Sequence, residues 1–278
     1  MTTKRMGEEG FRWFLGTVEN VDDPLQLGRV KIRVMNEHDD PTITTDDLLW
    51  ATPIVPVIYA SNQQVGRSPT GITVGSIAFG FYLDGQEKQI PMIFGTYSKI
   101  PDGTQATNDV PALARGQNTI HPSLIGPEPE SSYAAQYPFN HVWQTQSGHI
   151  IEVDDTPANE RIRTYHKSGT YTEISKDGTE VSKIVGDGYE IVAGDKTIYV
   201  KGICNIEVVG DCNLIGANNI TLTAAAGIEM SAPAGINITK GNLTVADNIS
   251  SGTGASGAFS TPSGQTVHVQ DCIITNIY

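Results

Sequence analysis

The chain has 278 residues and a formal net charge of −13, from 18 basic and 31 acidic side chains. This balance argues against nucleic acid or an anionic membrane surface as a partner, because both are bound by Lys and Arg that neutralise phosphate. No apolar run approaches the ~20 residues of a membrane-spanning helix, and the first residues, MTTKRMGEEGFRW, contain no apolar signal core. The three cysteines build no disulfide framework in a chain of this length, so we expect assembly in a reducing cytoplasm. The 29 glycines and 15 prolines, with few segments of helical period, indicate an all-β protein.

Residues 1–97 are predicted to form an N-terminal barrel of short strands. In GRVKIRVM, Val30, Ile32 and Val34 alternate with basic residues, which is the pattern of a half-buried antiparallel strand. FRWFLGTVENV precedes it, and WATPIVPVIY, GSIAFGFYL and QIPMIFGTY follow it, separated by Gly, Pro and Asp turns. Five short strands in this length are typical of the OB fold, a partly open barrel.

OB folds usually bind single-stranded nucleic acid, which stacks on aromatic side chains in a basic groove. The aromatic residues of this barrel lie mostly within alternating strands of an acidic chain, so we expect them in the core and predict no nucleic-acid binding. They are Trp13, Phe14, Trp50, Phe79, Phe81 and Tyr82.

Residues 98–139 are predicted to be an extended linker. They are rich in Pro, Gly, Asn and Ser, and they show neither the period of a strand nor that of a helix. The segment is too long for an ordinary loop inside a domain and too short for a typical independent domain.

Residues 140–258 are predicted to form a needle with a regular eight-residue repeat from about residue 178. Turn glycines mark the first clear repeats: Gly186, Gly194, Gly202 and Gly210. Between the glycines, apolar and polar residues alternate as in a strand. We expect each glycine to mark a bend, where positive φ is accessible without a Cβ penalty.

The third, fifth and seventh positions of each octad share one face of the strand, and this face is mostly apolar. We predict that it points inward. The inward core is then Ile198, Val200, Ile206, Val208, Leu214, Leu222, Ile228, Met230, Ile236 and Ile238. A strand of eight residues cannot bury such a face by itself, and it leaves both of its backbone edges open.

Two assemblies would pair those edges. A single-chain β-solenoid normally needs three strands per coil and thus a period near ~20 residues, and the sequence shows no strong triplet superperiod. Three identical chains wound round one axis would instead pair each strand with a neighbouring chain one octad later. The period of eight favours this second fold, an intertwined triple-stranded β-helix, or β-prism, formed by a homotrimer.

Two stretches of the sequence resemble one protein family. WFLGTVENVDDPLQLGRVKIRV resembles the start of the OB domain in the central spike, or cell-puncturing, proteins of contractile-tailed phages. YPFNHVWQTQSGHIIEVDDTP and the residues after it resemble the beginning of their β-helical needle, and the octads are the family's hallmark. Type VI secretion spike proteins are a more distant match. The resemblance implies a trimer in the tail baseplate of the virion, with its OB barrels on a hub protein and its needle directed at the host envelope.

The best-known member of that family carries a lysozyme domain between barrel and needle. Here the interval is only the linker, so we carry over no muramidase activity and predict a structural spike that is not an enzyme. It would puncture the host envelope when the tail contracts. The alternative is a trimeric fibre that binds or cleaves surface polysaccharide. That function would need carboxylate pairs and aromatic platforms along the needle, where aromatics are sparse beyond the Tyr165–Tyr199 region.

His149, Glu152, Asp154 and Asp155, in GHIIEVDD, are residue types that bind metals or transfer protons. They occupy an alternating strand that runs into the turn DDTP. We therefore expect the acids to cap or solvate that turn, and we assign no catalytic or metal-binding residue.

Four residues of the inward columns are unusual. Cys204 and Cys212 are one octad apart and are expected as small buried thiols, one beneath the other in neighbouring chains. Lys196 and Lys240 have two explanations. Either the octad positions are assigned wrongly in those two repeats, or the interior holds ions or water that bind the lysine ammonium groups.

Residues 259–278 are predicted to close the fibre with two alternating strands, QTVHV and IITNI. Some phage spikes end in a tip whose paired histidines bind iron, whereas this stretch offers only His268. Three copies of His268 could hold one ion on the threefold axis, but a surface or packing histidine is favoured, and we predict no cofactor. A separate tip protein at this end stays open as a possible partner.

Overall fold

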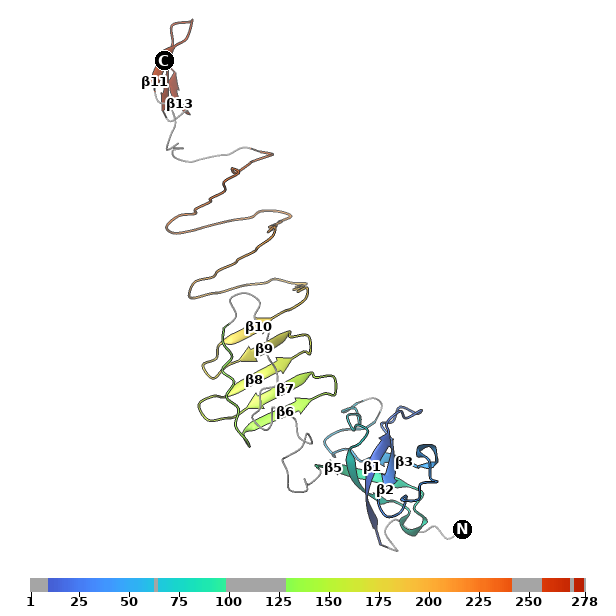
Figure 1. Cartoon of the computed structure of the whole chain (residues 1–278). Coiled ribbons are helices and arrows are strands. Elements are labelled where there is room, and N and C mark those ends of the chain that lie inside the picture. The colour runs from blue at the N-terminus through green and yellow to red at the C-terminus, as the bar shows by residue number, and fades with distance from the viewer. Residues whose placement is uncertain (1–9, 63–64, 99–128, 242–256, 271–272, 278) are drawn as a thin grey trace. The chain divides into compact units, whose positions relative to one another are not determined.

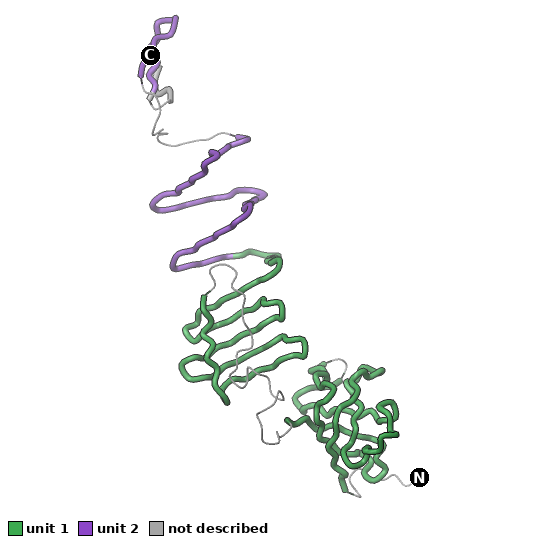
Figure 2. Tube along the Cα trace, viewed as in Figure 1, with its two compact units in different colours: residues 1–196 green, residues 197–278 purple. Residues whose placement is uncertain are grey.

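The structure is a computed structural model. It describes residues 10–62, 65–98, 129–241, 257–270 and 273–277. The chain is all-β apart from two short 3-10 helices, η1 (Thr45–Asp47) and η2 (Gly85–Glu87), and it divides into two units, residues 1–196 and 197–278 (Figures 1 and 2). In the described part of the chain, no helix combines the length and the apolar character that crossing a membrane requires.

The N-terminal part is a closed barrel with the strand order β1-β2-β3-β5-β4. Its strands are β1 (Arg12–Asn20), β2 (Val30–Val34), β3 (Trp50–Pro53), β4 (Ile77–Tyr82) and β5 (Pro91–Tyr97). Neighbours pair antiparallel except β3 and β5, which are parallel. The all-β class and the barrel of five short strands are confirmed.

The alternation in β2 sets the core of the barrel. Val30, Ile32 and Val34 are all buried there, as predicted. Lys31 is buried as well, because its Nζ donates a hydrogen bond to the backbone oxygen of Asp46 at 2.6 Å. A lysine can lie at this position because its long stem brings the charged end to a partner.

The prediction for the barrel aromatics is only partly right. Three are buried: Phe14, Phe81 and Tyr82. Trp50 and Phe79 are half-buried. Trp13 is 55% exposed and lies on the outer wall, because successive side chains of a strand point to opposite faces and Phe14 points inward.

Residues 140–183 fold as a five-stranded antiparallel meander with the order β10-β9-β8-β7-β6 (Figure 1). Its strands are β6 (Asn140–Gln144), β7 (Ile150–Asp154), β8 (Arg161–Tyr165), β9 (Tyr171–Ile174) and β10 (Glu180–Lys183). Gly148, Gly169 and Gly178 close three of its hairpins at φ values of 92°, 98° and 75°, a left-handed conformation that glycine adopts without strain. This meander was not predicted.

Residues 186–241 form no strand within the chain. Their extended runs are separated by bends at 185–186, 193–194, 201–202, 209–210, 217–218 and 225–226, and by a turn at 233–234. The interval is eight residues from 185–186 to 233–234, including the later octads that lack a glycine at the bend, and it shortens to seven at the last bend, 240–241. Residues 197–241 thus wind as an open coil, drawn in purple in Figure 2.

The expectation that the four turn glycines adopt positive φ is wrong. Gly186, Gly194, Gly202 and Gly210 all lie at bends, but none of them adopts positive φ. A Cβ atom added at any of them would meet no atom within 4 Å. These four bends are therefore made without positive φ, and the isolated chain does not itself require glycine at them, whereas Gly235 and Gly241, later in the segment, do adopt positive φ, at 95° and 93°.

The last sheet has three antiparallel strands in the order β11-β12-β13. They are β11 (Gly257–Ser260), β12 (Thr266–Gln270) and β13 (Ile273–Ile277). The second and third strands overlap the predicted segments QTVHV and IITNI.

Candidate assembly surfaces

The octads carry a large apolar surface that the chain does not cover. The ten side chains predicted to point inward are between 48% and 82% exposed. The backbone of this segment is open too. Within the described residues 186–241, the structure has one backbone–backbone hydrogen bond, a turn bond in which Gly235 N donates to Ala232 O at 2.9 Å. Extended backbone without partners is unfavourable when buried, and the backbone groups of this segment are left open in the described chain. The inward orientation of the ten side chains stays a prediction, because it depends on those chains.

One face of the β6–β10 sheet is also apolar and open. It carries a stripe across β6, β7, β8 and β9 in which Val153 lies opposite Ile162, and Ile162 lies opposite Ile174. Its side chains are 39–53% exposed. The apolar stripe consists of Trp143, Ile151, Val153, Ile162 and Ile174.

The opposite face of this sheet carries buried charges. Arg161 pairs through Nη2 with Glu152 Oε2 at 2.7 Å and through Nη1 with Glu173 Oε2 at 2.9 Å. Arg163 Nε lies 3.5 Å from the same Glu173 oxygen, and Asn140 Nδ2 donates to Glu152 Oε1 at 2.8 Å. These side chains form the ion cluster. Their charges are mutually compensated, which is what burial of ionised groups requires.

Residues 131–136 lie over the ion cluster. The Ser131 hydroxyl donates to Glu173 Oε1 at 2.8 Å, and the ring of Tyr133 lies 4.6 Å from Cζ of Arg161. Burial raises the pKa of Tyr133 to about 12, so its hydroxyl stays neutral. The charged face is therefore covered within the chain, and the apolar stripe is the face left for a partner.

The candidate chemical residues of GHIIEVDD do not converge. Glu152 belongs to the ion cluster, so the expectation that it solvates the turn is wrong. Asp154 is buried, and its Oδ1 accepts a hydrogen bond from Thr156 N at 3.0 Å, which caps the turn as expected. Asp155 and His149 lie outside this group, since Asp155 is near His141 and the His149 ring is near that of His166. Alternation in β7 places Glu152 and Asp154 on the covered face, away from solvent and substrate.

The histidines offer no metal site in the described residues. Asp155 Oδ2 lies 3.6 Å from His141 Nε2, and the His149 ring lies 4.4 Å from that of His166. His268 is exposed in β12. In that part of the chain, no three His, Cys, Asp or Glu residues are grouped so that they could hold a metal ion.

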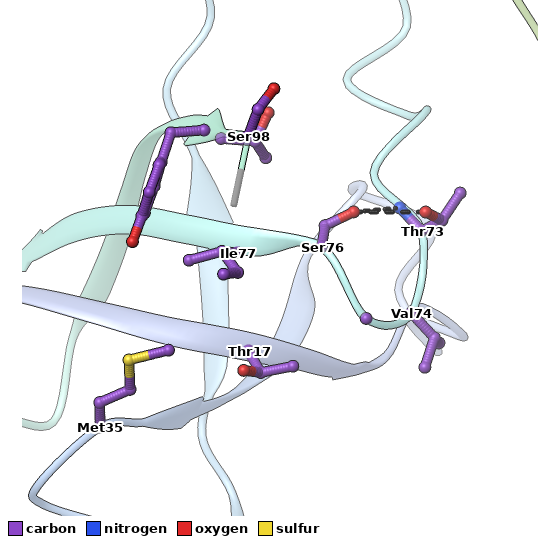
Figure 3. Close-up of a pocket in the computed structure, with 10 residues that line it drawn as sticks. Thr17, Met35, Thr73, Val74, Ser76, Ile77 and Ser98 are labelled. Atoms are coloured by element: carbon purple, nitrogen blue, oxygen red, sulfur yellow. Dashed lines mark hydrogen bonds between the residues drawn. The ribbon is translucent and has the colours of Figure 1, made fainter. Parts of the chain in front are cut away.

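One groove of the barrel lies beside β1 and β4 (Figure 3), with a volume of about 580 Å³. It is lined by Thr17, Met35, Ile77, Tyr97 and neighbouring small residues, none of which is charged, histidine or cysteine. Across its rim, the Thr73 and Ser76 hydroxyls lie 3.2 Å apart.

A second groove, of about 440 Å³, does contain titratable residues, including Glu37, Tyr82 and Lys88. Burial opposes ionisation of Glu37, but hydrogen bonds from Lys88 at 2.8 Å and Tyr82 at 3.1 Å outweigh it and lower its pKa. A carboxylate held ionised in this way is a poor general acid near neutral pH. The hydrogen bonds of Glu37 with Lys88 and Tyr82 form a structural link across the barrel.

The outer wall of the barrel carries an exposed aromatic wall. Trp13 stacks on Phe79 with ring centroids 5.2 Å apart, and Phe94 meets Phe79 edge-on at 6.4 Å. Phe11 contacts Phe81 edge-on at 5.3 Å. The aromatic wall consists of the exposed Phe11, Trp13 and Phe94 and the half-buried Phe79, whereas Phe81, which contacts Phe11 and Trp13, is buried. Contiguous exposed aromatics of this kind mark protein contacts.

The unusual residues of the octads take three different positions. Cys204 and Cys212 are exposed in the chain, so their burial stays a prediction that depends on partners. Lys196 pairs with the carboxylate of Glu190. Lys240 lies at the bend 240–241, one residue earlier than the interval of eight would place it.

Comparison with known proteins gives consistent matches. The family model of the Gp5 N-terminal OB domain matches residues 33–164. The chain is 32% identical over 262 residues to Protein Gp5 of Vibrio phage KVP40, across 70% of this chain and 62% of that protein. It is 46% identical over 81 residues to the pre-baseplate central spike protein Gp5 of Enterobacteria phage T4, across 26% of this chain and 14% of that protein. The chain thus spans less than two thirds of each relative.

Proposed function

Because this chain is a homologue of the Gp5 central spike proteins of phages, we propose that it is the central spike of a phage tail baseplate. Its trimeric needle punctures the host envelope when the tail contracts. The observation that carries the proposal is the open segment 186–241, whose apolar columns and extended backbone have no partner strand among the described residues of the chain.

The partners of that segment are two further copies of the same chain. Its bends and its apolar columns share a period of eight residues, so an identical chain displaced by one octad presents a matching strand edge. In such a trimer, the apolar stripe of each β6–β10 sheet packs against the other two sheets. The ion cluster lies on the outside, already covered by residues 131–136.

A trimer should hide thiols that the single chain exposes. In a Cys272→Ser background, which removes the cysteine outside the described residues, we expect Cys204 and Cys212 to resist a thiol-reactive dye until denaturant is added. Both are exposed in the chain, so a monomer would react at once. Sedimentation velocity gives the mass, and the labelling rate is measured on the same sample. A folded monomer at micromolar concentration, or a native trimer that labels rapidly, would contradict the proposal.

The barrel attaches to a baseplate hub protein through the aromatic wall. Trp13 and Phe94 are more than half exposed there, and large rigid rings are the side chains that contribute most to protein interfaces. The prediction that this fold does not bind nucleic acid is kept, because the chain offers 18 basic against 31 acidic residues.

The spike pierces without digesting. We expect purified trimer to leave a suspension of bacterial cell walls turbid and to leave host-surface polysaccharide at its original length, beside a muramidase that clears the same suspension. The reason is that the interval between barrel and needle is only the linker, residues 98–139, which is too short for a lysozyme domain. Clearing of the walls, or shortening of the polysaccharide, at a rate above buffer alone would contradict this prediction. It would favour the alternative function, a trimeric fibre that cleaves surface polysaccharide.

A further inference from the structure

Two charged residues stand in columns that are otherwise mostly apolar. Glu190 is the fifth residue of the octad that starts at Gly186, and Lys196 is the third residue of the octad that starts at Gly194. Alternation puts both on the column face. In the structure, the ammonium of Lys196 contacts a carboxylate oxygen of Glu190 across the bend at 193–194.

The burial of this pair depends on the other chains. The side chains of Lys196 and Glu190 are 42% and 65% exposed in the single chain. An ion pair on a surface contributes little, and each of its members can be changed at small cost. Inside a trimer, an uncompensated charge is costly, whereas a compensated pair is tolerated. The two environments therefore predict opposite responses to charge reversal.

We propose that Glu190 and Lys196 form a closed layer of three negative and three positive charges inside the needle, and that this layer makes assembly depend on matched chains. The inference rests on the trimer of the proposed function. In that trimer, the next octad of a neighbouring chain stacks on the strand that carries Glu190. Each Glu190 then lies between its own Lys196 and Lys196 of the neighbouring chain, within the reach of diagonal cross-strand pairs.

The layer also explains why a lysine can occupy an inward column. Its net charge is zero, since three lysines offset three glutamates, and no bound ion is needed to neutralise it. A chain displaced by one octad would set the pair against columns that carry Ile198 and Ile206, away from the charges of its neighbours. A buried polar layer that penalises displaced chains fixes register, as polar residues do in coiled coils.

Charge reversal in the full-length chain tests the layer. Glu190→Lys creates six positive charges at one level, and Lys196→Glu creates six negative ones, so each should lower the yield of trimer by roughly tenfold or more. The double variant Glu190→Lys/Lys196→Glu restores three of each sign and should recover most of the yield. Asp195→Lys is the matched control, because it reverses a charge beside Lys196 on the outward face, and it should assemble like the unaltered chain.

Sedimentation velocity and size-exclusion yield, measured on all five proteins, separate the outcomes. If the unaltered chain is not a trimer, the proposed function itself fails. If it is a trimer and both single reversals assemble like Asp195→Lys, the pair lies on the surface and the inference alone is overturned. If the single reversals fail and the double variant fails equally, the two positions do not compensate each other, and the inference is overturned as well.

Discussion

Ile206→Asp should abolish the trimer. Ile206 is 82% exposed in the single chain, so the change costs the monomer almost nothing. In the needle it would bring three carboxylates close together in an apolar interior, where desolvation and like charge both oppose ionisation. We expect trimer yield to fall to background and phage carrying the change to form no plaques, measured by sedimentation and by plaque counts.

Glu207→Gln is the matched control for that experiment. Residue 207 adjoins residue 206 and points to the opposite face of the same extended run, so its neutralisation should leave yield and plaque number unchanged. Equal behaviour of the two variants, or damage from Glu207→Gln alone, would show that the columns point outward.

Arg161→Ala should destabilise the β6–β10 sheet by about 3–5 kcal/mol, the cost of removing one partner from a buried ionic group. The substitution leaves the carboxylates of Glu152 and Glu173 without their closest positive charge. Hydrogen exchange of peptides from β7 to β9, followed by mass spectrometry, should show protection reduced by about 10²–10⁴-fold.

Lys167→Ala is the control for the sheet, because Lys167 is an exposed residue of the hairpin between β8 and β9. Its exchange pattern should match that of the unaltered protein. A loss of protection in Arg161→Ala no greater than in Lys167→Ala would mean that the ion cluster does not hold the sheet together.

Strand alternation was enough to predict the barrel. Val30, Ile32 and Val34 lie in the core because a half-buried strand has only one apolar face. The same rule shows why Trp13 was misplaced: it precedes Phe14 in one strand, and two adjacent residues of a strand cannot both point inward. Aromatic residue type alone does not determine which face of a strand a side chain takes.

The β6–β10 sheet could not be predicted in the same way. Alternation in β7 separates Ile151 and Val153 from Glu152 and Asp154, but it does not say which face is covered. Here the charged face is covered, because residues 131–136 supply Ser131 and Tyr133 to groups far away in the sequence. Such contacts depend on tertiary packing, which a local pattern does not contain.

The open coil of residues 186–241 has a consequence for how the spike is made. In the proposed trimer each coil would wrap round the other two, so three finished coils could neither be slid together nor pulled apart. The β6–β10 sheet contains only neighbouring hairpins, which each chain can fold by itself. The octads must then wind together from that end, one turn after another. Chains joined in this way could not be exchanged afterwards, so the three molecules that meet at synthesis would remain together for the life of the virion. One defective chain would then inactivate the whole spike.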